Sequence, residues 1–391
     1  MKYYALCIIN YALLLMLSGC IEEYEADISD DDAALLVVEG TICSGQLNKF
    51  YLSRTLPMNE YTPWMMADAS VAVRGDDGSE YMTTWSEEGC YVCWIERLDP
   101  DVAYYLHIEA DGEVYESDPQ KPLPTEKIAE VCGVQNTPES DIDVLITPND
   151  PFVSDQTNYY SWTYEQTWEV RPDYLTFIYF DPELQTKVDL EGSLFPERGW
   201  KDAIGQDILV GASNNYDGQH IRKLKLYGIS RGSEMIFHRY SGLIHQRAIS
   251  KAEYEYELAR RQASSEMGGL FTPLPSALPT NIHCLTSHKS VIGFIGCSLN
   301  TSAYRFFLNG WDFVIRRPSQ RDGRLWFEDT TIDDCMRMVD IGMYLCEWED
   351  ERMTGGPLKT AWAFKYQLDV RSQGAYVTEP DFWRLQGNVS Y

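Results

Sequence analysis

Short stretches in which apolar and polar residues alternate recur along the first third of this 391-residue chain, and glycine-containing turns separate them. Asp76-Asp77-Gly78 and Asp111-Gly112 each lie between two such stretches. Asp-Gly between alternating runs predicts a β-hairpin, because a type I′ turn requires a positive φ at both central positions. We therefore expect residues 33–118 to form a small β-sandwich of immunoglobulin-like or transthyretin-like type.

Three prolines in a polar stretch predict a linker at residues 119–126. A larger β-rich domain is expected to follow it, over residues 127–391. Within this domain the alternation of side chains favours further strands, one of them at residues 234–240. The expected fold is therefore mainly β, with two domains after the N-terminal segments.

An aromatic-rich strand is predicted at residues 159–170, which read YYSWTYEQTWEV. Successive side chains of a strand point to opposite faces, so Tyr160, Trp162, Tyr164 and Trp168 share one face. The simplest interpretation is that this face packs in a core. A platform on which sugars or bases stack is the alternative.

One helix is clearly indicated, at about residues 250–266. It opens on Ser250-Lys251-Ala252-Glu253. This pattern is a capping box, in which the serine accepts from the third backbone N–H and the glutamate reaches back to the cap. Gly268-Gly269 predicts its end.

The N-terminus has the features of a lipoprotein signal peptide at residues 1–19. Lys2 precedes an apolar run from Ala5 to Leu17, which is too short to span a bilayer. The run ends in Leu17-Ser18-Gly19-Cys20, which matches the bacterial lipobox. Lipid attachment is therefore expected at Cys20, and further acyl chains such as palmitate would make the anchoring firm. An ordinary signal peptide followed by a chance cysteine is the alternative.

An acidic tether is predicted at residues 20–32, because IEEYEADISDDD follows the cysteine without a basic residue. The stretch resembles the acidic run after the lipidated cysteine that marks cell-surface lipoproteins in Bacteroidota. Glu22, Glu23 and Glu25 are on that interpretation a surface-export signal. The expected location is the outer membrane, with the lipid-anchored body facing the cell exterior.

The charge balance excludes several partners. The chain has 32 basic and 60 acidic residues, a formal charge of −28. Nucleic-acid binding needs clustered Lys and Arg to displace counterions, so no nucleic-acid partner is expected. Peripheral binding to anionic lipid is disfavoured for the same reason. Membrane contact is expected through the N-terminal lipid alone.

Eight cysteines remain after Cys7 of the signal peptide and Cys20 are set aside. An even number in an exported chain is consistent with disulfides, although buried free thiols remain possible. The candidates are Cys90 with Cys93, and Cys335 with Cys346. Cys90-x-x-Cys93 lacks a second pair that would complete a zinc site, so a structural disulfide or core thiols are favoured there.

No sequence motif identifies a reaction. The chain has no G-x-S-x-G, H-E-x-x-H, P-loop or G-x-G-x-x-G pattern. His283 and His288 have weak metal spacing, and a pair in a loop is the favoured interpretation. We expect no catalytic residue, metal or cofactor, and therefore no enzyme.

The chain resembles the Bacteroidota outer-membrane lipoprotein family known as domain of unknown function 4249, through pieces whose order and spacing match along the mature chain. These pieces are Val38-Glu39-Gly40, Arg239-Tyr240-Ser241, the helix at 250–266, Gly269-Leu270-Phe271, Asn281-Ile282, Val291-Ile292-Gly293-Phe294, Arg305 and Pro380-Asp381-Phe382-Trp383. The resemblance implies a lipoprotein that is often encoded beside a TonB-dependent outer-membrane receptor.

The chain departs from the family pattern at three places. The resemblance implies a cysteine where Gly199 stands, and a Cys-x-x-Cys-like segment where Asp369-Val370-Arg371 stands. A disulfide common in the family is therefore expected to be absent, with Cys335 and Cys346 as a local substitute. Thr280 replaces a glycine before Asn281-Ile282.

The leading hypothesis for function is an accessory binding protein for a TonB-dependent nutrient receptor, with an unknown ligand. A structural or adhesive surface lipoprotein is the first alternative, and a cryptic hydrolase is the second.

Overall fold

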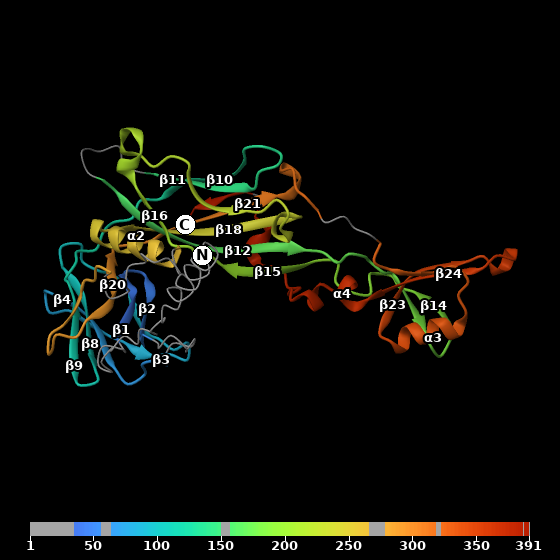
Figure 1. The fold of residues 1–391 in the computed structure, drawn as a ribbon, viewed down its shortest axis with the longest axis horizontal. Helices are drawn as coiled ribbons and strands as arrows, with labels where there is room; N and C mark the ends of the chain where they lie inside the picture. The colour runs from blue at the N-terminus through green and yellow to red at the C-terminus, as the bar shows by residue number, and fades with distance from the viewer. Residues whose placement is uncertain are drawn as a thin grey trace, which may run out of the picture.

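The computed structural model describes residues 35–55, 64–149, 157–265, 278–317, 322–385 and 387–390. The signal peptide, Cys20 and the acidic residues Glu22, Glu23 and Glu25 lie outside these described residues. The expected fold class is confirmed, because the structure is mainly β with several sheets. The described residues form three packed bodies, each with its own buried core. In Figure 1 the first body lies beneath the left part of the central body, and the third projects to the right.

The first body is a β-sandwich of two sheets. One sheet contains, in order, β20 (Val291–Ser298), β1 (Leu36–Cys43), β2 (Gln46–Arg54), β7 (Tyr91–Ile95) and β6 (Thr84–Trp85), with β3 (Trp64–Met65) beside β2. The other contains β19 (Ile282–Cys284), β9 (Glu113–Ser117), β8 (Tyr104–Ala110), β4 (Ser70–Gly75) and β5 (Glu80–Met82). Apolar side chains of both sheets meet between them.

The Asp-Gly turn between β8 and β9 has the predicted backbone. Asp111 has φ 53° and Gly112 has φ 76°. Both values are positive, as a type I′ hairpin requires. The predicted hairpin is therefore confirmed at this position.

The sandwich takes two strands from far along the chain, which the sequence analysis assigned to the C-terminal domain. β20 pairs in parallel with β1 over its whole length, with Val38 opposite Gly293. β19 pairs antiparallel with β9. Asn281 joins the segment before β19 to β20, because its side-chain amide donates to the Ile295 carbonyl at 2.9 Å and its side-chain oxygen accepts from the Ile295 N–H at 2.9 Å. The sandwich therefore does not end at residue 118.

The segment expected to be a linker is packed against this returning strand. Leu123 bridges Ser298, and Gln120 exchanges two backbone hydrogen bonds with Tyr104. Thr125 and the Asn300 side chain exchange two more, at 3.0 and 2.9 Å. Residues 119–126 therefore join the first two bodies through fixed contacts rather than spacing them apart.

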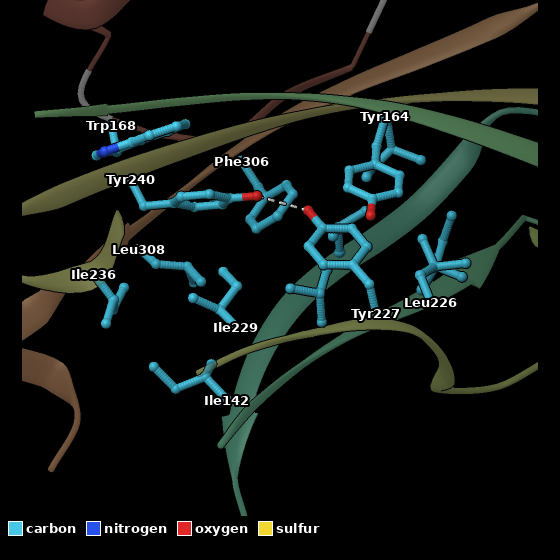
Figure 2. Packing of buried hydrophobic residues seen from close by; sticks show 14 of the residues in the cluster. Ile142, Tyr164, Trp168, Leu226, Tyr227, Ile229, Ile236, Tyr240, Phe306 and Leu308 are labelled. Atoms are coloured by element: carbon cyan, nitrogen blue, oxygen red, sulfur yellow. Dashed lines mark hydrogen bonds between the residues drawn. The ribbon is translucent and has the colours of Figure 1, made fainter. Parts of the chain in front are cut away.

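The central body places two sheets around a second core. The larger sheet contains β15 (Gly199–Ile204), β12 (Tyr159–Val170), β18 (Arg239–Ile249), β21 (Ser302–Asn309) and β25 (Val389–Ser390), with β16 (Leu209–Ala212) also paired to β12. The smaller contains β10 (Ile128–Gln135), β11 (Ile142–Pro148) and β17 (Leu224–Ile229). Figure 2 shows the apolar side chains that fill the space between them.

The aromatic face of β12 packs in this core. Tyr160, Trp162, Tyr164 and Trp168 are all buried, and each belongs to the central cluster. The indole N–H of Trp162 donates to Gln246 at 2.9 Å, which satisfies its polar atom within the core. The interpretation as core packing is confirmed, and the alternative of an exposed stacking platform is wrong.

Three tyrosines of the same core contact one another, two through their hydroxyls and two through their rings (Figure 2). The hydroxyls of Tyr227 and Tyr240 lie 2.8 Å apart, and Tyr240 also donates to Gln166 at 3.0 Å. The ring of Tyr164 stacks on that of Tyr227 with centroids 4.0 Å apart. Burial is the main cause that raises the pKa of Tyr240 and Tyr227 well above the usual value of 10. Both hydroxyls therefore remain neutral.

Replacing Tyr240 with phenylalanine is expected to lower the free energy of unfolding by about 1–3 kcal/mol, because it leaves a buried hydroxyl of Tyr227 without its partner. Urea denaturation of the two proteins measures the change. Tyr366→Phe is the control, since that hydroxyl belongs to a side chain that is 57% exposed. An equal effect of the two substitutions contradicts the prediction.

Helix α2 (Lys251–Ser265) confirms the predicted helix, and its cap follows half of the predicted pattern. Ser250 Oγ accepts from the Glu253 N–H at 3.1 Å. The Glu253 carboxylate does not complete the capping box; it pairs instead with Arg247 on β18. Residue 266 and Gly268-Gly269 lie outside the described residues. In the described segments, none of the helices has the length and apolar character needed to cross a bilayer.

The third body projects from the far end of the central one (Figure 1). Its three-stranded sheet contains β22 (Leu325–Phe327), β24 (Leu358–Phe364) and β23 (Met343–Asp350), and a hairpin is formed by β13 (Ile178–Asp181) and β14 (Thr186–Asp189). The helices are α3 (Ile332–Asp340) and α4 (Lys365–Leu368). Residues 127–391 thus contain two packed cores, where the sequence analysis expected one domain.

Helix α3 was not predicted, although the sequence contains the pattern of its N-terminal cap, Thr331 followed three residues later by Asp334. The Thr331 hydroxyl accepts from the Asp334 N–H at 3.2 Å, and Asp334 accepts from the Thr331 N–H at 2.9 Å. This is a complete capping box with aspartate in place of glutamate.

Candidate functional site

A pocket of about 440 Å³ opens at the end of the central body where β12 ends and β18 begins. Its wall combines basic and aromatic side chains from three segments of the chain. The lining residues are Glu169, Arg171, Phe237, His238, Arg239, Gly310, Trp311, Phe313, Ile315 and Arg317. The volume lies within the range of about 300–1,000 Å³ that is usual for small-molecule sites.

The end of β12 supplies an ion pair to the pocket. Glu169 is 5% exposed, and the Arg171 Nε donates to its carboxylate at 2.7 Å. Pro172 follows and has no N–H with which to continue the strand. The Arg171 side chain is 56% exposed and lines the pocket, so the guanidinium that Glu169 holds through Nε remains accessible to solvent.

A tight turn before β18 supplies His238. The sequence analysis predicted a strand over residues 234–240, and this prediction is wrong for its first part. Ser233 caps a 3₁₀ turn at Glu234–Ile236 by accepting from the Met235 N–H at 3.3 Å. The strand therefore begins at Arg239, and the turn brings Phe237 and His238 to the pocket.

The loop after β21 closes the other side. Gly310 donates its N–H to the His238 carbonyl at 2.6 Å. A Cβ on Gly310 would overlap the Ile236 carbonyl oxygen, so this close approach requires glycine. The next residue, Trp311, is 76% exposed and stands at the rim of the pocket.

The pocket is a basic site on an acidic protein. Three arginines and one glutamate line it, which gives a local charge of +2 with His238 neutral. Burial lowers the pKa of His238 below its usual value of 6.5, and the positive charges of Arg171 and Arg317 lower it further, while Glu169 opposes them. This charge contrasts with the −28 of the whole chain. Such a wall can bind an anion, and its aromatic members can pack on a flat group.

This site was not among the predicted features of the sequence. His238, Arg171, Trp311 and Arg317 were not singled out from the sequence. The available clue was that aromatic and basic residues lie close together in sequence, at Phe237-His238-Arg239 and again in the segment from Trp311 to Arg317.

Beside the pocket, pieces that carry the family resemblance meet in space. Arg239 donates to the carbonyls of Trp383 and Leu385 at 2.5 and 2.6 Å, and its guanidinium lies 4.2 Å from the Phe307 ring centroid. Arg305 lies 3.6 Å from the centroid of Phe382. These contacts fasten the C-terminal segment to β18 and β21, so Arg239 has a structural role as well as a place in the pocket wall.

The departures from the family pattern also meet. A Cβ on Gly199 would lie 2.9 Å from a methyl group of Val370. The two places where the resemblance implies cysteines are therefore neighbours, and a glycine with a valine fills the space instead. Thr280 adopts a role of its own, because its hydroxyl donates to the Gly293 carbonyl at 2.7 Å.

Cys90 and Cys93 are free thiols in the structure, so the disulfide proposed for them is absent. They lie three residues apart at the start of β7, and extended backbone of that length spans about 10 Å. A disulfide holds its Cα atoms within about 7 Å. Cys93 packs in the sandwich core, whereas the Cys90 Sγ lies 3.3 Å from the Ser86 hydroxyl.

Cys335 and Cys346 are also free thiols, which corrects the second candidate disulfide. Cys335 belongs to α3 and is buried in the core of the third body. Cys346 lies at the register shift of β23, outside that core, and its thiol contacts the Tyr344 carbonyl. Burial raises the pKa of Cys335 to about 11 and that of Cys346 to about 12, so both thiols stay protonated at neutral pH.

The weak metal hypothesis finds no support at His283. Its Nε2 lies 3.1 Å from Asp118, in a pair at the edge of the sandwich. Across the described ranges, no cluster of three or more His, Cys, Asp or Glu side chains could hold a metal ion.

Comparison with known proteins gives a family and no activity. A family model described as a domain of unknown function, DUF4249, matches residues 21–303. None of the curated proteins matches the chain. Among solved structures, a DUF4785 family protein from Legionella pneumophila matches with 11% identity and a TM-score of 0.17, over 54% of this chain and 52% of that one. A likeness at this TM-score carries no argument about function.

Proposed function

Because the chain belongs to the DUF4249 family, we propose that it is a lipid-anchored binding protein of the outer-membrane surface that works beside a TonB-dependent receptor. The proposal has two parts. The N-terminal sequence suggests the location at the outer-membrane surface, and the pocket suggests a ligand site. It assigns the chain no catalytic reaction.

The proposed location at the outer-membrane surface rests on the lipobox at Leu17-Ser18-Gly19-Cys20 and on the acidic run that follows it. The body described by the structure begins at residue 35. The twelve residues from Ile21 to Asp32 reach at most ~40 Å at ~3.5 Å per residue. This reach permits docking on a neighbouring barrel and prevents action far from it.

The pocket at the end of β12 is the observation that carries the binding role. It is of ligand size, it gathers three arginines in a chain of charge −28, and an exposed tryptophan stands at its rim. Stability of the fold does not require an exposed tryptophan at this position. A concave site of this size with a small number of charged groups is typical of small-molecule binding.

The partner is expected to be recovered with the protein. Mild-detergent purification of the tagged wild-type chain should bring down a TonB-dependent receptor in near-equal amount. Cys20→Ala should lose the lipid, as shown by mass spectrometry, and leave the outer-membrane fraction.

Cys7→Ala is the matched control, since it removes a cysteine of the signal peptide and leaves the lipobox and the nucleophilic thiol of Cys20 in place. Recovery of the wild-type lipoprotein alone, under conditions that preserve other receptor–lipoprotein pairs, contradicts the receptor role and favours the adhesive alternative. Retention of Cys20→Ala in the outer-membrane fraction, together with wild-type protein that carries no lipid, contradicts the anchor.

A further inference from the structure

We propose that the pocket between the ends of β12, β18 and β21 binds a small organic anion that carries a flat ring, with Arg171 and Arg317 binding the anionic group and Trp311 covering the ring. The inference deepens the proposed binding function and rests on it for its biological meaning. Binding of the anion does not need the receptor, so it can be measured on the purified protein alone.

The arginines are placed to bind a carboxylate or phosphate. The Nε of Arg171 is committed to Glu169, and its terminal nitrogens have no hydrogen-bond partner among the residues that the structure describes. Arg317 donates one N–H to the Phe237 carbonyl and otherwise lies on the exposed edge of the pocket. Guanidinium groups bind carboxylates and phosphates through paired, charge-assisted hydrogen bonds.

Arg239 does not take part in this binding. Both of its terminal nitrogens donate to backbone carbonyls of the C-terminal segment, and its plane lies against Phe307. Its charge still contributes to the potential of the pocket. The division of roles separates a structural arginine from two arginines that face the opening.

The ring is expected to contact the aromatic part of the wall. Trp311 is 76% exposed, and Phe237 and Phe313 line the same pocket. A flat apolar group that enters beside Trp311 would cover part of its surface and remove water from it. Inorganic anions lack such a group, so they should bind more weakly than an anion with a ring.

Charge elsewhere on the molecule favours this assignment. The chain as a whole carries −28, so an anion is repelled from most of its surface. The cluster of Arg171, Arg239 and Arg317 reverses the sign locally. Measured binding of a small anion can therefore be assigned to this pocket when a substitution there removes it.

Binding is expected to take up a proton at His238. The charged groups around this ring are Glu169 and Arg171 at the end of β12, Arg239 on β18 and Arg317 after β21. Burial and the charges of Arg171 and Arg317 lower the pKa of His238 in the free protein. A bound anion raises that pKa again, so the complex holds more protons than the free protein between the two values. Affinity therefore rises as the pH falls through that interval.

Calorimetric titration of the full mature chain in detergent tests the proposal with three probes: 2-naphthoate, its uncharged analogue 2-naphthamide, and inorganic phosphate. The wild type should bind 2-naphthoate at least about tenfold more tightly than either other probe. Arg317→Gln should weaken 2-naphthoate by about tenfold, and Trp311→Ala should weaken it without changing phosphate.

Arg352→Gln is the matched control, because it removes the same charge from a 52% exposed arginine on the third body. Arg171 is tested as Arg171→Lys, since loss of its charge would leave the buried Glu169 unpaired. Lowering the pH from about 8 to about 5.5 should tighten naphthoate binding in the wild type and not in His238→Gln.

Equal binding of naphthoate and naphthamide, or an Arg317→Gln protein that binds as the wild type does, overturns the proposal. Phosphate binding as tight as that of naphthoate overturns the part assigned to the ring. The receptor pulldown separates this inference from the proposed function. Receptor recovery with no naphthoate binding rejects the ligand class alone, and naphthoate binding without receptor recovery rejects the receptor role alone.

Discussion

Replacing Glu253 with alanine is expected to lower the free energy of unfolding by about 3–5 kcal/mol, because it leaves the charge of Arg247 buried without a partner. Glu253 is the glutamate of the predicted capping box. Its backbone N–H donates to Ser250, but its carboxylate pairs with Arg247. The pair lies where the sandwich, β18 and α2 meet, so its loss should loosen the junction between the first two bodies.

The geometry of the pair explains the size of the effect. The two guanidinium nitrogens of Arg247 lie 2.5 and 3.1 Å from the two carboxylate oxygens of Glu253, which is a bidentate arrangement. The side chains are 17% and 5% exposed. A Cβ on Gly296 of β20 would overlap the Glu253 carboxylate, so the returning strand closes directly over the pair. Burial raises the pKa of the neighbouring Cys43 to about 11, as expected in a poorly hydrated junction.

Hydrogen exchange of β1, β18 and β20 is the suitable measurement, since three cores need not unfold together. Glu255→Ala is the matched control on the same helix, because Glu255 pairs with Lys251 at 3.5 Å and both are more than half exposed. That change should cost less than about 0.5 kcal/mol. A comparable loss in both variants shows that helix propensity, rather than the buried pair, causes the effect.

Replacing Gly293 with alanine is expected to cost about 2–6 kcal/mol, because a side chain there meets both backbone strain and the neighbouring strand. Gly293 has φ 138°, where residues other than glycine are disfavoured. Its added Cβ would overlap the carbonyl oxygen of Val38, which lies opposite it in the parallel pair of β1 and β20. The strand can relieve the overlap only by moving away from β1.

Thermal unfolding and exchange of the β20 amides measure this change. Gly228→Ala is the matched control, because Gly228 also lies within a strand and the nearest atoms to its added Cβ are 3.8 Å away. The control should stay within about 1 kcal/mol of the wild type. Normal protection of β20 in Gly293→Ala contradicts the close approach of the two strands.

Local features of the fold were predictable because their causes lie within a few residues. The Asp111-Gly112 hairpin depends on which residues tolerate a positive φ, and the Ser250 cap depends on one hydroxyl and one N–H three residues on. The inward face of β12 follows from the two-residue period of a strand. Helix α3 has an equally local cause in Thr331 and Asp334, although it was not among the predicted elements.

The pairing of β20 with β1 could not be inferred from those patterns. Val291–Ile295 has the composition of a strand that fits many sheet edges, and the cost of closing a loop grows only slowly with its length. The separation of about 250 residues between β1 and β20 therefore neither favours nor excludes their pairing. The packing of the sandwich core, with glycine at position 293, selected it.

By itself, the sequence determined the mainly β character of this protein, the turn between β8 and β9 and the start of α2. These features depend on dihedral angles and hydrogen bonds between near neighbours. Tertiary structure alone decided that Arg247 pairs with Glu253, that Gly199 packs on Val370, and that Arg171, His238 and Arg317 share one pocket. Gly199 and Val370, like the residues of the pocket, lie on segments that are distant in sequence. Arg247 and Glu253 are six residues apart, but they belong to a strand and a helix that the returning strand β20 covers. Each of these contacts depends on how whole sheets pack, which no local pattern encodes.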